Sequence, residues 1–397
     1  MILLRFVYAD NAATTRIADP VLAAMMPYLT ENYGNPSTLY KKGREAKKAL
    51  DDAREKVAAL IGATPYEIIF TGGGSEADNM AIKGVLTGKA AKGRKKLIIS
   101  SIEHHAVLHT ADALKKAGYD VVVLPVDSVG VVDLEALESA IDENTALVSI
   151  MAANNEIGTI EPIRDIARIC HDKGVLFHSD AVQAAGHIPL DVKEMGIDLL
   201  SLSAHKINGP KGVGALYVKK GVALAPVIDG GGQERGLRSG TENVAGLVGL
   251  GEAARIAKDH MGSEGARLAA LRDKLIAGVT ERIPFTHVTG HPQNRLPGTA
   301  SFVFECIEGE SLILRLDAAG ICGSTGSACS TGSLDPSHVL MAIGLKHEIA
   351  HGSLRLSLGI DTNDADIDYI VDSLVEIVGK LRDMSPLWDA KEKKPVK

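Results

Sequence analysis

Over its first two-thirds the chain alternates two patterns of apolar and polar residues. Short apolar runs rich in β-branched side chains predict buried strands, and stretches with an apolar residue every three or four positions predict helices between them. The predicted strands are Glu67–Thr71, Leu97–Ser101, Val121–Val126, Ala146–Met151, Val175–Ser179, Leu199–Ser203 and Gly214–Val218. The predicted helices are Gly43–Leu60, Glu76–Leu86, Ala106–Ala117, Leu134–Ala140 and Ile163–Asp172. This alternation is typical of an α/β fold in which helices cover both faces of a mainly parallel sheet.

The last third of the chain predicts a second, smaller α+β domain. A long helix, Val244–Met261, leads into it. Its expected elements are the helix Leu268–Val279, the strand Ala300–Cys306, the helix Gly309–Ala319 and a closing helix Asp364–Leu381. We therefore expect a large domain over residues 15–260 and a small domain over residues 1–14 and 261–388. Residues 389–397 are basic and contain a proline, which predicts a disordered tail or a docking tail for an acidic partner.

Composition and charge exclude several classes of partner. The net charge is −7, from 43 basic and 50 acidic residues, which argues against binding to nucleic acid or to an anionic membrane surface. One tryptophan and six phenylalanines leave few platforms on which bases could stack. The apolar start of the chain is too short for a signal peptide, and no segment reaches the length of a membrane span, so we expect a cytoplasmic protein.

The four cysteines do not form a disulfide framework, because 397 residues hold only four and no two are spaced C-x-x-C. Cys170 falls at helical spacing among apolar residues and is expected in a core. Cys306 alternates with Phe302 and Phe304, which places it on the apolar face of a strand. Cys329 lies in a Gly/Ser-rich stretch, residues 323–333, where we expect a mobile, exposed loop. An exposed thiol in such a loop is open to unwanted oxidation, so we expect its reactivity to serve a function.

Polar residues follow five of the predicted strands, where ligands of open α/β sheets bind. Lys206 follows one buried strand, where an ammonium loses hydration and gains nothing unless the amine is used, as it is in Schiff-base chemistry. Gly72-Gly73-Gly74-Ser75 follows another and opens a helix, which predicts either a phosphate cup or a plain tight turn. His104 follows a third strand and could stack on a planar ring or lie at the surface.

The remaining strand ends complete this pattern. Asp180 follows a fourth strand, where it could pair with Lys206 or keep a pyridine nitrogen protonated. Asn155 and Gln183 are then candidates to hydrogen-bond a ring hydroxyl. A phosphate cup, a stacking ring, a partner for a pyridinium and a Schiff-base lysine at one edge of one sheet together predict a site for pyridoxal 5′-phosphate (PLP).

Several motifs then identify a family. The chain resembles the cysteine desulfurases of the NifS/IscS family, which are fold-type I PLP enzymes, from about residue 8 to residue 387. The resemblance rests on Asp10-Asn11-Ala12-Ala13-Thr14-Thr15, Gly34-Asn35-Pro36-Ser37, Glu103-His104, Asn154-Asn155-Glu156-Ile157-Gly158, Asp180-Ala181-Val182-Gln183 and Ser203-Ala204-His205-Lys206. It continues with Arg238-Ser239-Gly240-Thr241-Glu242-Asn243, Gly326-Ser327-Ala328-Cys329, Pro336-Ser337-His338-Val339-Leu340 and Arg355-Leu356-Ser357-Leu358-Gly359.

The resemblance implies roles for single residues. Lys206 would hold PLP as a Schiff base, His104 would stack on its ring and assist proton transfers, and Asp180 would pair with the ring nitrogen. The ring oxygen would face Gln183 and Asn155. The phosphate would be held by Gly74, Ser75, Ser203 and His205, and by Thr241 of a second subunit, because the family's enzymes are homodimers.

The resemblance also implies the reaction. Arg355, together with Asn155, would bind the carboxylate of L-cysteine, a task that suits the planar guanidinium. Cys329 would be the nucleophile that becomes a persulfide while L-cysteine is converted to L-alanine. The sulfur would pass to an acceptor, such as an iron–sulfur scaffold protein, with which Cys329 could also share a metal cluster as a transient ligand.

One departure from the family pattern is visible, and two other functions stay open. Members commonly have Ser-Gly-Ala-Thr where this chain has Gly72-Gly73-Gly74-Ser75, and we expect the extra glycines to make the cup more flexible and to weaken PLP binding slightly. A selenocysteine lyase or an aminotransferase is one alternative, although an aminotransferase has no need of Cys329. A PLP-carrying scaffold protein that binds an iron–sulfur assembly partner is the other.

Overall fold

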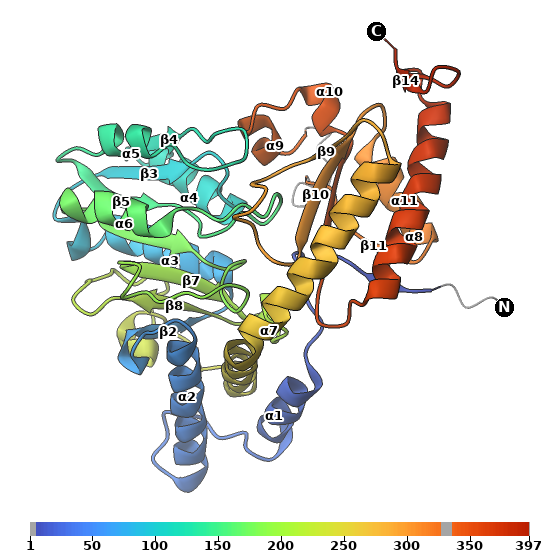
Figure 1. Ribbon diagram of the computed structural model, residues 1–397. Coiled ribbons are helices and arrows are strands. Elements are labelled where there is room, and N and C mark those ends of the chain that lie inside the picture. Colours follow the sequence, from blue (N-terminus) through green and yellow to red (C-terminus); the bar gives the residue numbers. More distant parts are fainter. Residues whose placement is uncertain (1–4, 327–335, 397) are drawn as a thin grey trace.

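A mainly parallel sheet forms the centre of the larger half of the protein, as the sequence predicts (Figure 1). The computed structural model describes residues 5–326 and 336–396. In this part of the chain the sheet has seven strands in the order β2-β8-β7-β6-β5-β3-β4. The strands are β2 (Ile68–Thr71), β3 (Lys96–Ser100), β4 (Asp120–Leu124), β5 (Thr145–Ser149), β6 (Leu176–Asp180), β7 (Leu199–Ser203) and β8 (Gly214–Val218). Strand β8 runs antiparallel to both of its neighbours, and the other pairs are parallel.

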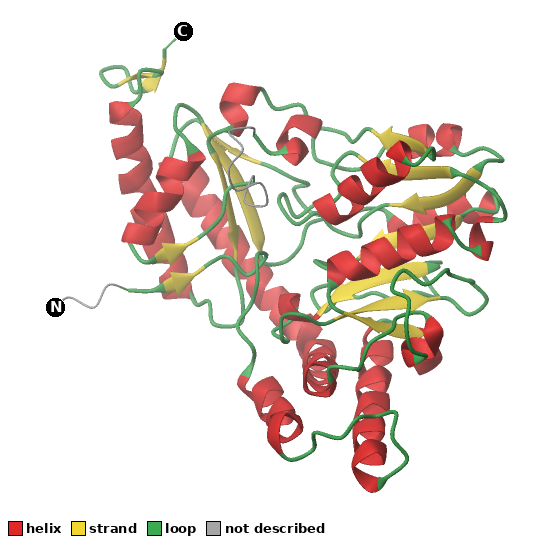
Figure 2. Cartoon of the chain, turned by 180° about the vertical axis from the view of Figure 1, so that it is seen from behind, coloured by secondary structure: helices red, strands yellow, loops and turns green. Residues whose placement is uncertain are grey.

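Helices cover both faces of this sheet, which Figure 2 shows from behind. Ile98 of β3 joins the core on one face, with α2, α5 and α6, whereas Leu97 and Ile99 join the core on the other face, with α3 and α4. This alternation follows from the two-residue period of a strand. The helices of this half are α1 (Asp19–Thr30), α2 (Lys41–Leu60), α3 (Gly74–Leu86), α4 (His105–Lys116), α5 (Leu134–Ala140) and α6 (Ile163–Asp172). Short 3₁₀ helices are η1 (Pro65–Glu67), η2 (Lys89–Ala91), η3 (Ala204–Lys206) and η4 (Gln233–Gly236).

One long helix, α7 (Val244–Arg282), connects the two halves. The sequence predicts two helices here, Val244–Met261 and Leu268–Val279, and the stretch between them contains Gly262 and Gly265, each of which costs about 1 kcal/mol in a helix. Instead α7 continues across the predicted domain boundary at residue 261. Its first part packs on α1 and α2 and its last part on α11 (Asp364–Met384), so contacts at both ends offset the weak middle.

The smaller half combines short sheets with the end of α7. Its strands β9 (Thr286–Val288), β10 (Thr299–Phe304) and β12 (Ser353–Ser357) form an antiparallel sheet in the order β12-β10-β9. Strand β1 (Val7–Tyr8) from the start of the chain pairs in parallel with β11 (Ile321–Cys322). The helices are α8 (Gly309–Ala318), α9 (His338–Ala342), α10 (His347–Ala350) and α11 (Asp364–Met384). Phe302 and Phe304 of β10 pack in its core beside Leu374 of α11.

Two predictions near the end of the chain are wrong. Cys306 does not lie on a strand: β10 ends at Phe304, and Cys306 has a φ of 67° in the turn that follows, where its thiol donates to the Leu387 carbonyl at 3.2 Å. The tail predicted as disordered forms a short hairpin in its described part, in which β13 (Trp388–Asp389) pairs with β14 (Lys394–Pro395). Arg382 lies 4.6 Å from the Trp388 ring, a cation–π contact that the local composition does not reveal.

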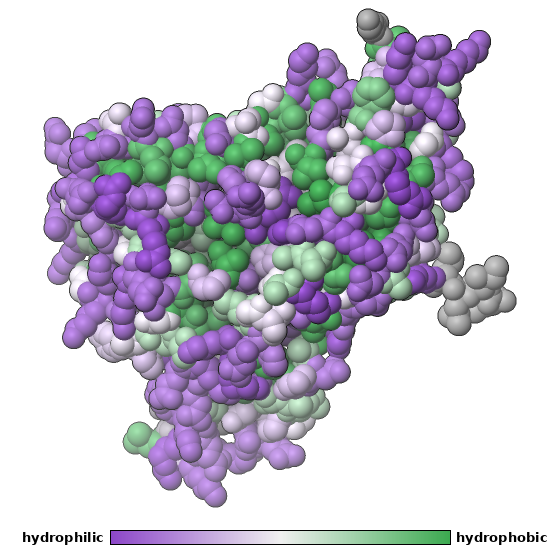
Figure 3. Space-filling view, viewed as in Figure 1, coloured by the Kyte–Doolittle hydropathy of each residue, from purple (hydrophilic) through white to green (hydrophobic). Residues whose placement is uncertain are grey.

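The two halves meet through an apolar cluster that lies beyond the strand ends of the large sheet. Ile102 and Met151 follow β3 and β5, and they pack with Val303 of β10 and with Val339 and Leu340 of α9. In the space-filling view, hydrophilic residues cover most of the visible surface of both halves (Figure 3). The junction therefore places the smaller half against the edge of the sheet where the sequence predicts a site.

Candidate active site

A cavity of about 340 Å³ lies at the carboxyl ends of the parallel strands. Its lining includes residues that follow five strands of the large sheet and one residue of β12 in the smaller half. The predicted site residues around it are Gly74, Ser75, His104, Asn155, Asp180, Gln183, Ser203, His205, Lys206 and Arg355. Ten residues that are far apart in the sequence thus share one cavity, which is what the strand-end rule leads us to expect.

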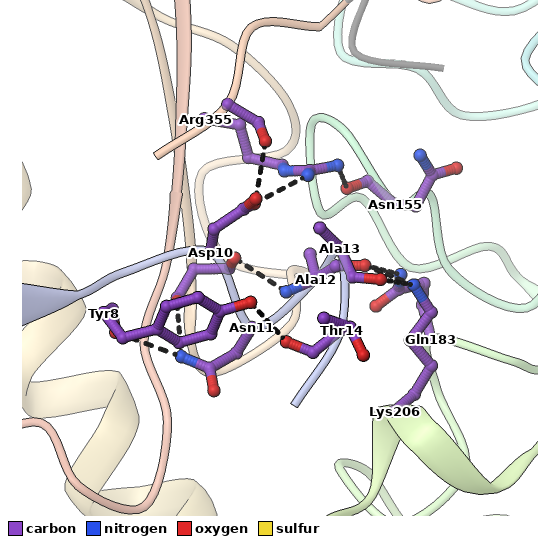
Figure 4. A network of polar contacts seen from close by, with 12 residues as sticks. Tyr8, Asp10, Asn11, Ala12, Ala13, Thr14, Asn155, Gln183, Lys206 and Arg355 are labelled. Carbon is purple, nitrogen blue, oxygen red and sulfur yellow. Dashed lines mark hydrogen bonds and ion pairs between the residues drawn. The ribbon is translucent and has the colours of Figure 1, made fainter. Parts of the chain in front are cut away.

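The Lys206 amine is held against the N-terminal segment (Figure 4). Lys206 ends η3, which directly follows β7, and its Nζ donates to the Ala12 and Ala13 carbonyls at 2.5 Å and 2.8 Å. The Gln183 amide donates to the same Ala12 carbonyl at 2.9 Å. In the sequence, the segment Asp10–Thr15 stands out only as a family motif. In the structure its backbone forms one wall of the cavity.

Two buried carboxyl groups, of Asp180 and Asp78, are part of the cavity lining. Burial raises the pKa of Asp180 to about 6, against the hydrogen bond from the Val182 amide and the charge of Lys206. Asp78, from α3, also lines the cavity and is 1% exposed. Burial and the negative charge of Asp180 raise the pKa of Asp78 well above its usual range. Asp78 was not among the predicted site residues, and its only signal in the sequence is a charged residue on the apolar face of a predicted helix.

A neutral histidine and two hydroxyl groups lie beside this acid pair. His178 of β6 lies between two hydroxyls, with Nδ1 2.8 Å from Ser149 Oγ and Nε2 3.0 Å from Ser201 Oγ. Its Nε2 is 3.7 Å from Asp78 Oδ1, an atom without a hydrogen-bond partner among the described residues. Burial lowers the pKa of His178 to about 3, so it carries no positive charge that could pair with Asp78. The positive charge that faces this acid pair therefore comes from Lys206 and not from His178.

His104 is held as a neutral ring at the start of α4. As the N-cap, its Nδ1 accepts a hydrogen bond from the Ala106 amide at 3.1 Å, which leaves the proton of the neutral ring on Nε2. Burial and the charge of Lys206 lower the pKa of His104 to about 4. The preceding Glu103 is fully buried, and its Oε1 accepts from Ser100 and from the Met151 amide. Glu103 therefore fixes the strand ends beside His104.

The predicted phosphate cup is the N-terminus of α3. Gly73 is its N-cap, with a φ of 153°, and the Gly72 amide donates to Glu76 Oε2 at 2.9 Å. A Cβ atom on Gly74 would stand 2.6 Å from Val182 Cγ2. Gly74 is thus required by close packing, which the expectation of a merely flexible cup did not include. The first amides of a helix can bind a phosphate, and Ser75 stands at this end.

Arg355 reaches the cavity from β12 of the smaller half. Its side chain is 5% exposed, and its guanidinium donates from Nη1 to the Asn155 carbonyl at 3.0 Å and from Nη2 to Asp10 Oδ1 at 2.9 Å. The Asn155 side chain also lines the cavity. A buried guanidinium that lines the same cavity as Lys206 can bind the carboxylate of an amino acid.

One predicted residue does not line the cavity, and another lies outside the described residues. Thr241 is exposed in the loop before α7 and is absent from the cavity lining. Cys329 lies outside the described residues. Of the other cysteines, Cys170 is buried in the core as predicted, and burial raises the pKa of its thiol to about 12.

Neither a metal centre nor a membrane span is found in the described part of the chain. No three His, Cys, Asp or Glu side chains within residues 5–326 and 336–396 converge so that they could hold a metal ion. None of the described helices combines the length and the apolar content that a membrane crossing requires.

Comparisons with known proteins agree with this geometry. Residues 7–370 match the family model of the class-V aminotransferases. The cysteine desulfurase IscS of Clostridium botulinum (strain Hall) is 54% identical over 385 residues, which cover 96% of this chain and 97% of that protein.

Solved structures agree as well. A NifS-like protein is 43% identical with a TM-score of 0.89 and is matched over 95% of this chain and 100% of its own. A structure described as SspA in complex with cysteine is 39% identical, with a TM-score of 0.79 and coverage of 89% and 98%. The chain belongs to the cysteine desulfurases of the NifS/IscS family, within the class-V aminotransferases.

Proposed function

We propose that this protein is a PLP-dependent cysteine desulfurase that converts L-cysteine to L-alanine and carries the sulfur on Cys329. The observation that carries this proposal is the single cavity at which the Lys206 amine, the buried Asp180 carboxylate and the Arg355 guanidinium meet. The names of the relatives and the structure in complex with cysteine support the choice of substrate.

The residues around the cavity fit PLP. The volume of about 340 Å³ falls in the range of small-molecule sites. Asp180 is ready to pair with the ring nitrogen, Ser203 and His205 lie beside the N-terminus of α3 where the phosphate would bind, and Gln183 and Asn155 line the wall where the ring oxygen would lie. Burial lowers the pKa of His205 to about 4, so the phosphate would meet hydroxyls and amides there rather than an imidazolium. When bound, PLP supplies an aldehyde for an amine and a ring that withdraws electrons from the substrate's α-carbon.

Each step of the reaction is carried out by particular residues of this chain. Arg355 binds the substrate carboxylate, and the Lys206 amine takes the α-proton and returns it. His104 faces the cavity as a neutral ring with its proton on Nε2, so it can donate and recover that proton without first losing another. Cys329, as a thiolate, attacks the substrate sulfur; the S–S bond forms while the C–S bond breaks, and its electron pair returns to carbon, which is protonated to give L-alanine.

We also propose that the enzyme is a homodimer in which Thr241 completes the phosphate site of the partner subunit. In the single chain Thr241 is exposed at the surface. Helix α1 exposes Leu22, Met26 and Leu29 at 45%, 48% and 57%, an apolar surface that a second subunit could cover. Sedimentation equilibrium tests this proposal, and a monomer at micromolar concentration would contradict it.

The fate of the sulfur is part of the proposal. We propose that the Cys329 persulfide delivers sulfur in the cytoplasm to an iron–sulfur scaffold protein, and that Cys329 can be a transient ligand of the cluster formed there. Neither nucleic acid nor a membrane is a partner in this scheme, in line with the acidic net charge of −7.

The test is the formation of L-alanine from L-cysteine in the presence of a reductant. We expect the wild-type protein and Cys306→Ser to form L-alanine, and Cys329→Ser to bind PLP without releasing sulfur. Equal turnover by Cys329→Ser would contradict the role of this thiol. Activity on L-selenocysteine alone would indicate a selenocysteine lyase, transfer to a keto acid an aminotransferase, and binding of a scaffold protein without turnover the scaffold alternative.

A further inference from the structure

The carboxylate-binding arginine is already paired inside this chain. Arg355 Nη2 donates to Asp10 Oδ1 at 2.9 Å, and both side chains are largely buried, at 5% and 16% exposure (Figure 4). Asp10 and Arg355 are 345 residues apart in the sequence. A buried guanidinium without a compensating carboxylate is costly, so Asp10 stabilises the charge of Arg355 in the absence of a ligand.

Hydrogen bonds to neighbouring segments hold both Asp10 and Arg355 in place. Ser324 and Arg355 exchange two backbone hydrogen bonds, at 2.6 Å and 3.1 Å, and the Ser324 hydroxyl donates to the second oxygen of Asp10 at 2.7 Å. The backbone of Asp10 also forms an isolated parallel β-bridge with Ser357, two residues after Arg355. Because Ser324 occupies Oδ2, Asp10 binds the guanidinium through Oδ1.

The guanidinium keeps donors for a second anion. Nη1 binds the Asn155 carbonyl, whereas Nε has no hydrogen-bond partner among the described residues. The other nearby acid is Glu156, which accepts a hydrogen bond from Ser337 and whose pKa burial raises to about 7. Asp10 is therefore the carboxylate in direct contact with Arg355, and a substrate carboxylate would bind beside it.

We propose that Asp10 sets the affinity of the site for amino-acid carboxylates by neutralising Arg355, and that this keeps the binding of the product L-alanine weak. This inference rests on the proposed function, because it assigns the substrate carboxylate to Arg355. L-cysteine and L-alanine carry the same carboxylate and amine, so an uncompensated arginine would hold substrate and product equally tightly. Uniformly tight binding of this kind slows product release. Asp10 is thus a positioning and charge-balancing residue.

The test is the binding of L-alanine to the PLP-loaded Asp10→Asn protein, measured by calorimetry. Asparagine keeps the shape and an acceptor oxygen for Nη2 but removes the charge. We expect the dissociation constant for L-alanine to fall about tenfold or more, because the ligand no longer meets a negative charge near its carboxylate. The melting temperature without ligand should fall, and saturating L-alanine should restore more of it than in the wild type. In turnover, kcat and KM for L-cysteine should fall together.

A matched control is Glu234→Gln, which removes the charge from another buried pair, Arg54–Glu234, at 2.7 Å. This variant should lose stability without gaining affinity for L-alanine. The double variant Asp10→Asn/Arg355→Gln contains no uncompensated guanidinium, so it should be more stable than Asp10→Asn and remain measurable if the single variant does not fold.

The outcomes separate the two proposals. Unchanged or weaker binding of L-alanine by Asp10→Asn would overturn the inference, as would a double variant no more stable than Asp10→Asn. If Arg355→Gln binds L-alanine as tightly as the wild type, the assignment of the carboxylate to Arg355 fails, and with it that part of the proposed function. Loss of binding in Arg355→Gln with no gain in Asp10→Asn refutes only the role of Asp10.

Discussion

Replacing Gly74 by alanine should disturb the phosphate site through a single steric contact. The new Cβ would lie 2.6 Å from Val182 Cγ2 and 3.5 Å from Ser203 Cβ. Carbon atoms prefer separations of about 3.5–4.0 Å, so the contact with Val182 is short by about 1 Å. The β-branched side chain of Val182 has a restricted χ1 and cannot easily turn away. The start of α3 must therefore move, and the amides that would bind the phosphate move with it.

The size of the effect follows from this overlap. Overpacking of this kind costs about 1–3 kcal/mol. If most of this cost falls on the bound state, the dissociation constant for PLP rises about 5- to 150-fold. We would measure it by equilibrium dialysis of the apoprotein against PLP and would follow the free energy of unfolding of the same samples in urea.

Two further variants make this reasoning refutable. The double variant Gly74→Ala/Val182→Ala should recover most of the lost affinity, because the methyl group that causes the overlap is gone. Gly379→Ala, on α11, meets no atom within 4 Å and should leave PLP binding unchanged. A Gly74→Ala protein with wild-type affinity would show that the cup tolerates the extra carbon, and strictly additive effects in the double variant would show that Val182 is not the obstacle.

Two predictions concern buried acids. Burial raises the pKa of Glu161 to about 8, so the folded state holds a proton that the unfolded state releases, and this contribution to stability is present below pH 4.5 and is lost as the pH rises to 8. Glu161→Gln keeps an oxygen that can accept the hydrogen bond from the Val132 amide, which lies 3.0 Å from Glu161 Oε2. In this variant the loss of unfolding free energy between pH 5 and pH 8 should be smaller, by about 1.4 kcal/mol for each unit by which the Glu161 pKa is raised. An unchanged slope in urea titrations would argue against a protonated Glu161. For Asp180, with its pKa of about 6, we expect the apoprotein's affinity for PLP to decline as the pH falls through 6, and the Asp180→Asn protein to bind weakly with a flatter profile. Parallel profiles for the two proteins would assign this pH dependence to another group.

The relation between Gly74 and Val182 illustrates why some predictions from sequence were incomplete. Glycine at the start of a helix has several possible reasons, and sequence context alone suggested flexibility. The actual reason is a side chain 108 positions away, which packs against α3 because both follow strands of the same sheet. The same is true of Asp78, whose proximity to Asp180 depends on the packing of α3 against β6 and β7.

The sequence by itself determined the strands of the large sheet and most of the residues around the cavity. Apolar runs such as Leu199–Ser203 indicate buried strands directly. Polar residues that follow parallel strands must meet at one edge of the sheet, so Lys206 and Asp180 could be placed together without coordinates. Only the tertiary structure decided that α7 is a single helix and that Asp10 neutralises Arg355. These features depend on contacts between segments far apart in the sequence, and the free energy of such contacts leaves no periodic trace in the local sequence.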